Sequence, residues 1–315
     1  MANPKTLPPE NMPQGMLWAL LGSFFGSTVF IVSRFLLMNN AIDPISMSTI
    51  RFLGGGTAML TWGLFKYGKE VLPSPGDLPA LFGLGLFGMA GMSTFLFFGQ
   101  QTTSAINSAI IREVVPVILN IIISFFLGEA LTSFHFVGLA TSTLGTLLVT
   151  GALTLQGFCF ASNHFRGDLL VFCSAICWII YSFLGRRVLS RLGSFRTTTW
   201  AMLFGGLQLQ LLLQFQSTAF INWSLAWPWL IYLAVCATAL VFLAWYKAME
   251  RLSWPLLNIV QCLTPVFAII LAVVFLAEHL DWLKVSGAVL VVFGIIIAGR
   301  IPKKTVSPMA ARGLH

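Results

Sequence analysis

Long, uninterrupted apolar runs constrain the fold of this chain more than any other feature of its sequence. An α-helix of about 20 residues, rising 1.5 Å per residue, crosses about 30 Å of hydrocarbon. Hydrophobic residues fill 57% of the 315 positions and charged residues only 9%, against about 25% charged in a soluble domain. Transmembrane β-strands are about ten residues long and alternate in polarity, which these runs do not. We therefore predict an all-α polytopic membrane protein with ten transmembrane helices, at residues 15–38, 44–66, 78–101, 104–127, 132–153, 167–189, 196–216, 226–247, 253–277 and 283–301.

The basic residues predict the orientation of the chain. If both termini are cytoplasmic, 13 of the 18 lysines and arginines lie at inner ends or loops and three lie outside, while Arg51 and Arg112 lie in the membrane. This is the bias described by the positive-inside rule. We expect an integral protein of a bacterial inner membrane with both termini in the cytoplasm. The net charge of +8 then reflects topology, and no loop is long enough for the basic patch of a nucleic-acid-binding domain.

The two halves of the chain repeat each other. Four residues recur in one register 149 positions later: Pro116 at Pro265, Glu129 at Glu278, Gly138 at Gly287 and Gly145 at Gly294. The register predicts a first five-helix repeat at residues 15–153 and a second at 167–301, joined by a connector at 154–166. A cytoplasmic N-terminal segment, 1–14, precedes them, and a cytoplasmic tail, 302–315, follows. Because five is odd, the second repeat enters the membrane from the opposite side. Inverted repeats of this kind place a substrate site near the midplane, around a central cavity.

Four stretches carry a wider pattern: "LLGSFFGSTVFIVSRFL", "DPISMSTIRF", "TTSAINSAIIREVVPVILNIIISFFLGEALT" and "WYKAMERLSWPLLNIVQCLTPVFAIILAVVFLAEHLD". They contain an Arg-Phe pair in the second helix, Arg51 and Phe52, and a proline followed thirteen residues later by glutamate in each repeat. This pattern resembles the EamA family of the drug/metabolite transporter superfamily over nearly the whole chain. The resemblance implies ten helices, cytoplasmic termini, and a cavity lined chiefly by helices 1, 3, 4, 6, 8 and 9 that exports small metabolites, amino acids and amphipathic drugs. We expect Arg51 to tie the second helix to a neighbour or to the outer interface.

A polar stripe follows one face of the fourth predicted helix. Ser108 and Arg112 lie on it, with a proline and an asparagine at the next two steps of four residues. In the second repeat Gln261 takes the position of Arg112, three residues after Asn258. Lipid cannot satisfy such groups, so we predict that these four residues line the cavity and bind substrate. The fork of donors on Arg112 suits a carboxylate. A purely structural network between helices is the alternative.

Four further residues are candidates with an alternative structural role. Trp178 and Tyr181 are three apart and can share a face toward the apolar part of a substrate, or serve in packing. Glu113, directly after Arg112, is a candidate for proton coupling, or it neutralises a donor on another helix. Lys247, at the inner end of the eighth helix, belongs to a gate or network, or only marks the topology.

These features favour a secondary transporter that works by alternating access and exports small amphipathic metabolites, such as amino acids or related carboxylates. The alternatives are a multidrug exporter for cationic or neutral solutes and a passive channel. A membrane enzyme would need an acidic pair, a histidine cluster or a phosphate-binding loop at a membrane surface, and we find none of these in the sequence. The sequence also lacks a Walker motif, so we do not expect ATP to drive transport directly. We expect no catalytic residue, metal or cofactor. The expected partners are a small-molecule substrate and membrane lipid, and the pattern predicts no particular oligomeric state.

Overall fold

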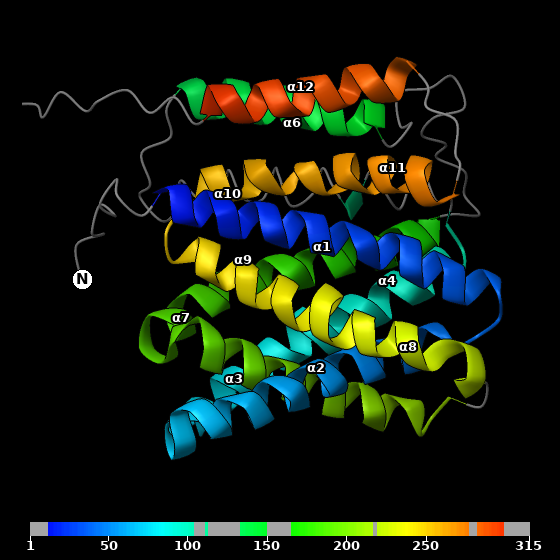
Figure 1. The fold of residues 1–315 in the computed structure, drawn as a ribbon, viewed down its shortest axis with the longest axis vertical. Helices are drawn as coiled ribbons and strands as arrows, with labels where there is room; N and C mark the ends of the chain where they lie inside the picture. The colour runs from blue at the N-terminus through cyan, green and yellow to red at the C-terminus, as the bar shows by residue number, and fades with distance from the viewer. Residues whose placement is uncertain are drawn as a thin grey trace, which may run out of the picture.

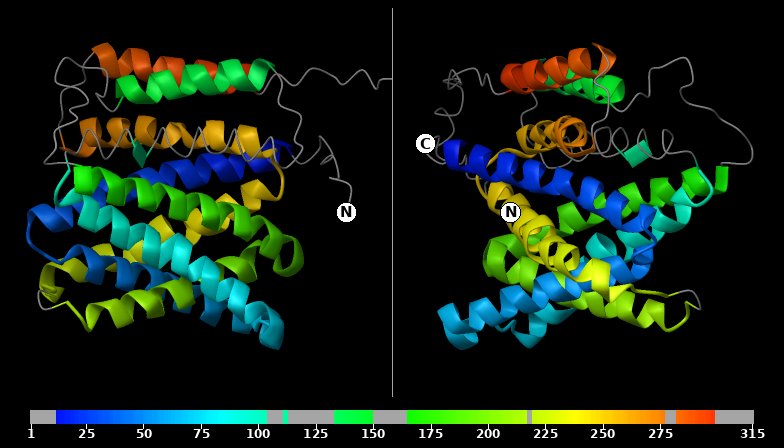
Figure 2. Two further views of the ribbon diagram at one scale, coloured as in Figure 1. Left: turned by 180° about the vertical axis from the view of Figure 1, so that it is seen from behind. Right: turned by 45° about the vertical axis from the view of Figure 1, so that its right-hand side comes forward.

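A computed structural model describes residues 12–103, 111–112, 133–149, 165–216, 219–276 and 282–298. These ranges are almost entirely helical, and an isolated antiparallel bridge joins Ile42 to Ile221. The helices are stacked in layers, with α6 (Ser133–Val149) and α12 (Trp282–Ala298) at one edge and α2 (Pro44–Tyr67) and α3 (Leu78–Gly85) at the other (Figures 1 and 2). The layers between them contain α1 (Met12–Met38), α4 (Met92–Gln100), the first half of α7 (Phe165–Leu213), α8 (Trp223–Ala234), α9 (Val241–Met249), α10 (Trp254–Gln261) and α11 (Leu263–Leu276). The second half of α7 lies beside α2 and α3 (Figure 1).

The helices fall on the predicted apolar runs. Among the described residues, five helical stretches are long and apolar enough to cross a membrane: Met12–Met38, Pro75–Gln100, Phe165–Leu213, Trp223–Met249 and Leu256–Phe275. The predicted helix 104–127 lies outside the described residues except for Ile111 and Arg112, which are helical. The structure is therefore that of a polytopic helical membrane protein, while the count of ten helices stays a prediction.

The outer surface of the bundle is apolar. Phe65, Phe215, Phe275 and Trp282 leave 89, 88, 71 and 83% of their area exposed. Soluble monomers rarely expose apolar side chains over such wide areas. A bilayer would cover these side chains, in agreement with the low content of charged residues.

The 49-residue helix α7 consists of two helices that meet at Gly193. The φ of this residue is 72°, in the left-handed region that glycine adopts without steric cost. The turn is attached to two other elements, because Arg191 pairs with Asp77 and the backbone N–H of Ser194 donates to Oε1 of Glu250 at 2.9 Å. One end of the bundle is therefore tied together around Gly193.

A second junction, between α1 and α2, is organised by Asp43. This residue is the N-cap of α2, and its Oδ1 accepts hydrogen bonds from the N–H groups of Ile45 and Ser46 at 3.1 and 2.9 Å. Its Oδ2 accepts from the N–H of Phe220, just before α8, at 3.1 Å. Proline follows at the first helical position, where no backbone donor is needed. One buried carboxylate thus joins the start of α2 to the segment that precedes α8.

Two π-helical segments interrupt long helices at matching positions. The first, η4 (Leu86–Gly91), joins α3 to α4, and the second, η5 (Val235–Leu240), joins α8 to α9. Each is six residues long, and they are 149 positions apart, the register found between the prolines and glutamates of the sequence. Such π-helical turns are rare and frequently lie at functional sites.

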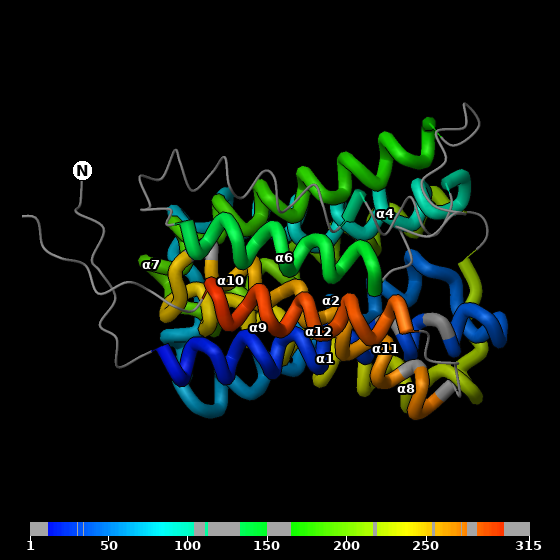
Figure 3. The backbone as a smooth tube through the Cα atoms, turned by 90° about the horizontal axis from the view of Figure 1, so that it is seen from above, coloured from blue at the N-terminus to red at the C-terminus, as the bar shows by residue number. Residues whose placement is uncertain are grey.

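Helices α6 and α12 form a close antiparallel pair, which Figure 3 shows from above. A Cβ placed on Gly138 would contact the carbonyl oxygen of Gly294, and one on Gly145 would contact that of Gly287. Only glycine permits this approach between backbones. Gly287 lies 149 positions after Gly138, and Gly294 lies 149 positions after Gly145. If the two halves of the chain are exchanged, the contact between Gly138 and Gly294 therefore becomes the contact between Gly287 and Gly145.

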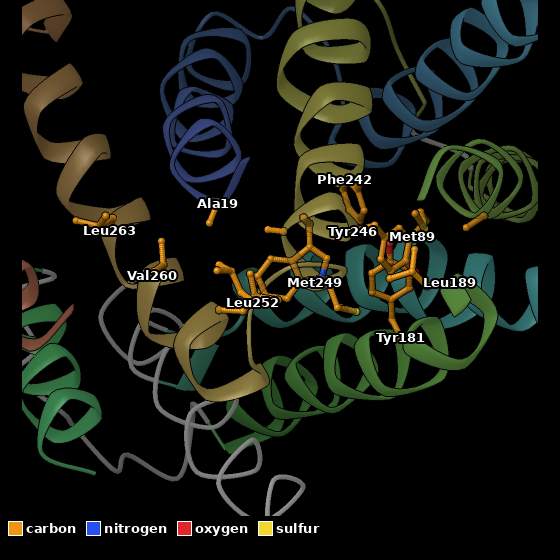
Figure 4. Packing of buried hydrophobic residues seen from close by; sticks show 14 of the residues in the cluster. Ala19, Met89, Tyr181, Leu189, Phe242, Tyr246, Met249, Leu252, Val260 and Leu263 are labelled. Atoms are coloured by element: carbon orange, nitrogen blue, oxygen red, sulfur yellow. The ribbon is translucent and has the colours of Figure 1, made fainter. Parts of the chain in front are cut away.

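The core contains a cluster of buried aromatic rings (Figure 4). Tyr181 of α7 and Tyr246 of α9 are fully buried, and their ring centres are 5.5 Å apart. Phe242 meets Tyr181 edge to face at 5.9 Å. Gly88 lies against the ring of Tyr181 and Gly185 against that of Tyr246, which leaves room for both rings between closely packed helices.

Candidate functional site

A cavity of about 840 Å³ lies inside the bundle. It extends along α1 from Ala19 to Met38 and reaches Gln100, the last residue of α4. Further lining comes from α2, the segment Ile111–Arg112, the first half of α7, η5 with α9, and α10 with α11. Its volume suits a small organic ligand. The lining includes residues of the helices implied by the family resemblance and adds α2 to them.

Two arginines supply the charge of the described lining. Arg112 lines the cavity from its short helical segment, and Arg51 lines it from α2. The Nε of Arg51 donates a hydrogen bond to Oγ1 of Thr238 at 3.0 Å, and the guanidinium lies 5.6 Å from the centre of the Phe52 ring. The two arginines are close enough for their positive charges to repel each other. The described lining therefore attracts anions and disfavours cations.

Asn258 and Gln261 line the cavity from the second half of the chain. Asn258 is buried, and Gln261 is the last residue of α10, before α11 begins at Leu263. Pro265 has no backbone N–H to offer the carbonyl of Gln261 four residues earlier, which explains an interrupted helix at this point. The polar pair predicted from sequence thus lies at a helix break beside the cavity.

Aromatic side chains form an apolar wall of the cavity. Trp178 of α7 and Trp245 of α9 both line it, with ring centres 5.4 Å apart, and Phe242 lies 6.1 Å from Trp178. Tyr181 contacts Trp178 at 5.5 Å but does not line the cavity, because it is fully buried behind that ring. Trp178 is thus placed to contact a ligand, and Tyr181 supports it from behind.

Of the remaining candidates, Lys247 lies within the described residues. Ser108 and Glu113 lie outside the described residues, as do Pro116, Glu129 and Glu278. The Nζ of Lys247 lies 5.0 Å from the centre of the Trp18 ring, and neither residue lines the cavity. The cavity therefore brings together Arg112, Asn258, Gln261 and Trp178 of the predicted set.

The sequence predicts that Arg51 holds the second helix to a neighbouring helix or to the outer interface. In the structure its hydrogen bond to Thr238 joins α2 to η5. The sequence did not place Arg51 in the cavity, nor Thr238 beside it. The Arg-Phe pair in α2 was a visible signal, but its partner is 187 residues away. Serine and glutamine residues of the lining, such as Ser174 and Gln100, carried no signal above their background frequency.

Membrane-spanning helices, an apolar outer surface and an internal cavity with two arginines on its described lining define a helical membrane protein with room for a small molecule between its helices. The sequence model of the EamA-like transporter family matches residues 13–151 and again residues 165–300. The chain therefore belongs to the EamA-like transporter family, of the drug/metabolite transporter type. This confirms the family resemblance and makes the protein a membrane transporter by family.

Relatives with similar sequences are named as transporters. An uncharacterized transporter, YyaM, of Bacillus subtilis is 26% identical over 93% of this chain and 97% of its own length. The aromatic amino acid exporter YddG of Ancylobacter novellus is 24% identical over 90% of this chain and 92% of its own. A solved structure, titled only as the crystal structure of a protein, has a TM-score of 0.79 at 21% identity, covering 94% of this chain and 99% of that one. This last likeness supports the fold.

Proposed function

We propose that the protein is a secondary transporter that exports small amphipathic carboxylates, such as amino acids, by alternating access. The observation that carries the proposal is a cavity with arginines on its described lining and tryptophans on its wall. A carboxylate would bind the guanidinium of Arg112 through paired hydrogen bonds. The apolar or aromatic remainder of the substrate would lie against Trp178 and Trp245.

Electrostatics favours an anionic substrate over the cationic drugs of the alternative proposal. Coulomb interactions are several times stronger inside a protein than in water, because the effective dielectric constant is about 20 or lower rather than about 80. The charged residues of the described lining are Arg51 and Arg112, so a cation entering the cavity would be repelled by both. A carboxylate would be attracted by both.

Paired contacts in the two halves support a ten-helix carrier built from inverted repeats, with both termini in the cytoplasm. The π-helical segments η4 and η5 are 149 positions apart. The two glycine contacts between α6 and α12 are equivalent to each other when residues 149 positions apart are matched. In such carriers the two halves move around a fixed site and expose it to each side in turn. A channel has no need of this symmetry.

The named relative agrees with the proposed substrate class. The protein from Ancylobacter novellus is called an exporter of aromatic amino acids, molecules that combine a carboxylate with an aromatic ring. We infer the same general chemistry and the same outward direction for this chain. The tryptophans of the cavity wall and the two arginines suit both parts of such a molecule.

Substitution of Arg112 tests the proposal. In proteoliposomes, Arg112→Ala should lower carboxylate flux at least about tenfold, the effect of losing a hydrogen-bonded charge. Arg112→Lys should restore part of it, because a point charge replaces a planar fork. The thermal unfolding midpoint in detergent should stay close to wild type in both variants.

Arg187 offers a matched control, because its guanidinium also lies near a ring, 5.4 Å from the centre of Phe183, but does not line the cavity. Arg187→Ala should leave carboxylate flux unchanged. An Arg112→Ala variant that unfolds at a much lower temperature would assign this arginine a structural role. A stable Arg112→Ala variant with normal flux would contradict the substrate-binding role as well.

A further inference from the structure

We propose that Arg51 forms a second anion-binding subsite in the cavity, so that the preferred substrate carries two negative charges. Either a dicarboxylate or a phosphate ester has this chemistry. The inference rests on the proposed function, in which Arg112 holds one carboxylate, and it assigns the second charge to Arg51.

Among the described residues, the position of Arg51 is set by one hydrogen bond, which uses only its Nε–H group. Its Nε donates to Oγ1 of Thr238, which is fully buried in η5. The two terminal amino groups of Arg51 donate to no residue within the described ranges, and the side chain lines the cavity. Phe52 lies beside the guanidinium. A guanidinium fixed at Nε, with terminal amino groups that donate to none of the described residues, can bind a carboxylate or phosphate with two parallel bonds.

The other half of the chain shows that this arginine is not needed to pack the helices. A Cβ on Gly55 would meet the carbonyl oxygen of Ala234 at 2.7 Å, and one on Gly205 would meet that of Gly85 at 2.8 Å. Gly85 and Ala234 are 149 positions apart, and Gly55 and Gly205 are 150 apart. The two contacts therefore correspond to each other in the two repeats, with α2 on α8 in one and the second half of α7 on α3 in the other.

Counting from these paired contacts identifies the counterpart of Arg51. Arg51 lies four residues before Gly55, and Ala201 lies four residues before Gly205. Thr238 lies four residues after Ala234, and Met89 lies four residues after Gly85.

In the second repeat, then, a fully buried Ala201 and a fully buried Met89 occupy the places of arginine and threonine. Apolar packing is sufficient at the equivalent junction. An arginine held by a threonine at only one of the two junctions, where the arginine lines the cavity, indicates a role toward a ligand.

Two positive charges near each other favour a ligand with two negative charges. Arg112 and Arg51 repel each other, and the described lining of the cavity contains no aspartate or glutamate. A monoanion bound at Arg112 leaves the charge of Arg51 without a counterion among the described residues of the lining, which is unfavourable at a site of low dielectric. A second acidic group on the ligand would neutralise Arg51 and remove the cost of leaving its charge uncompensated.

Matched ligand pairs test the inference on purified full-length protein. Succinate is compared with butyrate, glutamate with glutamine, and glycerol 3-phosphate with glycerol, by the fluorescence of the cavity tryptophans and by thermal shift. Wild type should bind the dianion of at least one pair about tenfold or more tightly than its partner, the discrimination expected of an additional charged hydrogen-bonding group. The pair that shows the preference identifies the second group as carboxylate or phosphate.

Arg51→Met keeps an unbranched apolar stem in place of the arginine stem and removes the charge. It should weaken binding of the dianion at least about tenfold more than binding of the monocarboxylate and so abolish the preference for the dianion, and Arg187→Met should change neither. If Arg51→Met does not fold, Thr238→Val gives the same comparison, because it removes the acceptor that orients Arg51, and a reduced preference is expected.

Each other outcome is decisive. If wild type binds both members of every pair equally, or if the Arg51 or Thr238 variant weakens both members equally, the second subsite is wrong and the carboxylate transporter still stands. If wild type binds neither mono- nor dianions, both proposals are wrong.

Discussion

Gly83 and Gly88 lie five residues apart at the start of the third apolar stretch, yet they have different surroundings. A Cβ on Gly83 would find its nearest neighbour, Cδ2 of Leu184, at 3.6 Å, an ordinary contact. A Cβ on Gly88 would overlap the ring of Tyr181, which is fully buried and enclosed by other aromatic rings. The ring cannot move aside without displacing Tyr246 or Trp178. Sequence alone does not distinguish these two glycines.

We predict that Gly88→Ala destabilises the protein by about 1–3 kcal/mol, the usual cost of overpacking a core. Gly83→Ala should be neutral or stabilising, because alanine is favoured over glycine within a helix by up to about 1 kcal/mol. Thermal unfolding of both variants in the same detergent checks the prediction. Equal midpoints for the two variants would show that the buried tyrosine has room to move.

Several residues of the site were predictable from spacing. Arg112, Asn258 and Gln261 were identified because polar side chains at helical intervals in an apolar run need a polar environment, and all three line the cavity. The cavity position of Arg51 was not predictable, because it depends on a hydrogen bond to Thr238, whose side chain has no polar signal beyond a single hydroxyl. Tyr181 was expected beside Trp178, and only the packing of Gly88 against its ring explains why it lies behind the lining.

At the scale of elements, the ends of helices follow local chemistry. The sequence Asp43-Pro44 marks the start of α2, since aspartate accepts from free N–H groups and proline needs no partner. The break between α10 and α11 follows from Pro265. The π-helical segments η4 and η5 have no proline or comparable marker in the sequence, because a shift from α- to π-type hydrogen bonding depends on how neighbouring helices pack.

Substitution of Asp43 tests the junction that joins α2 to the segment before α8. Asp43→Ala leaves three N–H groups without their acceptor, and loss of an N-cap together with a buried acceptor should cost about 1–3 kcal/mol. Asp43→Asn keeps one oxygen acceptor for the helix start and should recover much of that loss. Thermal unfolding in detergent measures both variants. An Asp43→Ala variant as stable as wild type would show that water or other groups replace the carboxylate.

At the scale of the whole molecule, the composition predicted a helical membrane protein and the family pattern predicted its class, and both are confirmed. The positions of most helices were also predictable, because apolar runs are bounded by turn residues such as Gly193 and Asn40, which lies between α1 and α2 and has a positive φ of 48°. How the halves fit together depends on side-chain packing that a single sequence does not reveal. The close approach of Gly138 to Gly294 and of Gly145 to Gly287 is an example: each glycine was visible, but its partner was not.

The central claim, a carrier for anionic solutes, is tested most directly by counterflow. Purified protein in proteoliposomes would be preloaded with the unlabelled carboxylate that gives the largest thermal shift among amino acids and dicarboxylates. We predict that uptake of the same labelled carboxylate saturates with concentration and is accelerated by the preload, because one site is exposed alternately to the two sides. Uptake that rises linearly and ignores the preload would indicate a channel, and exchange of organic cations but not of carboxylates would contradict the account.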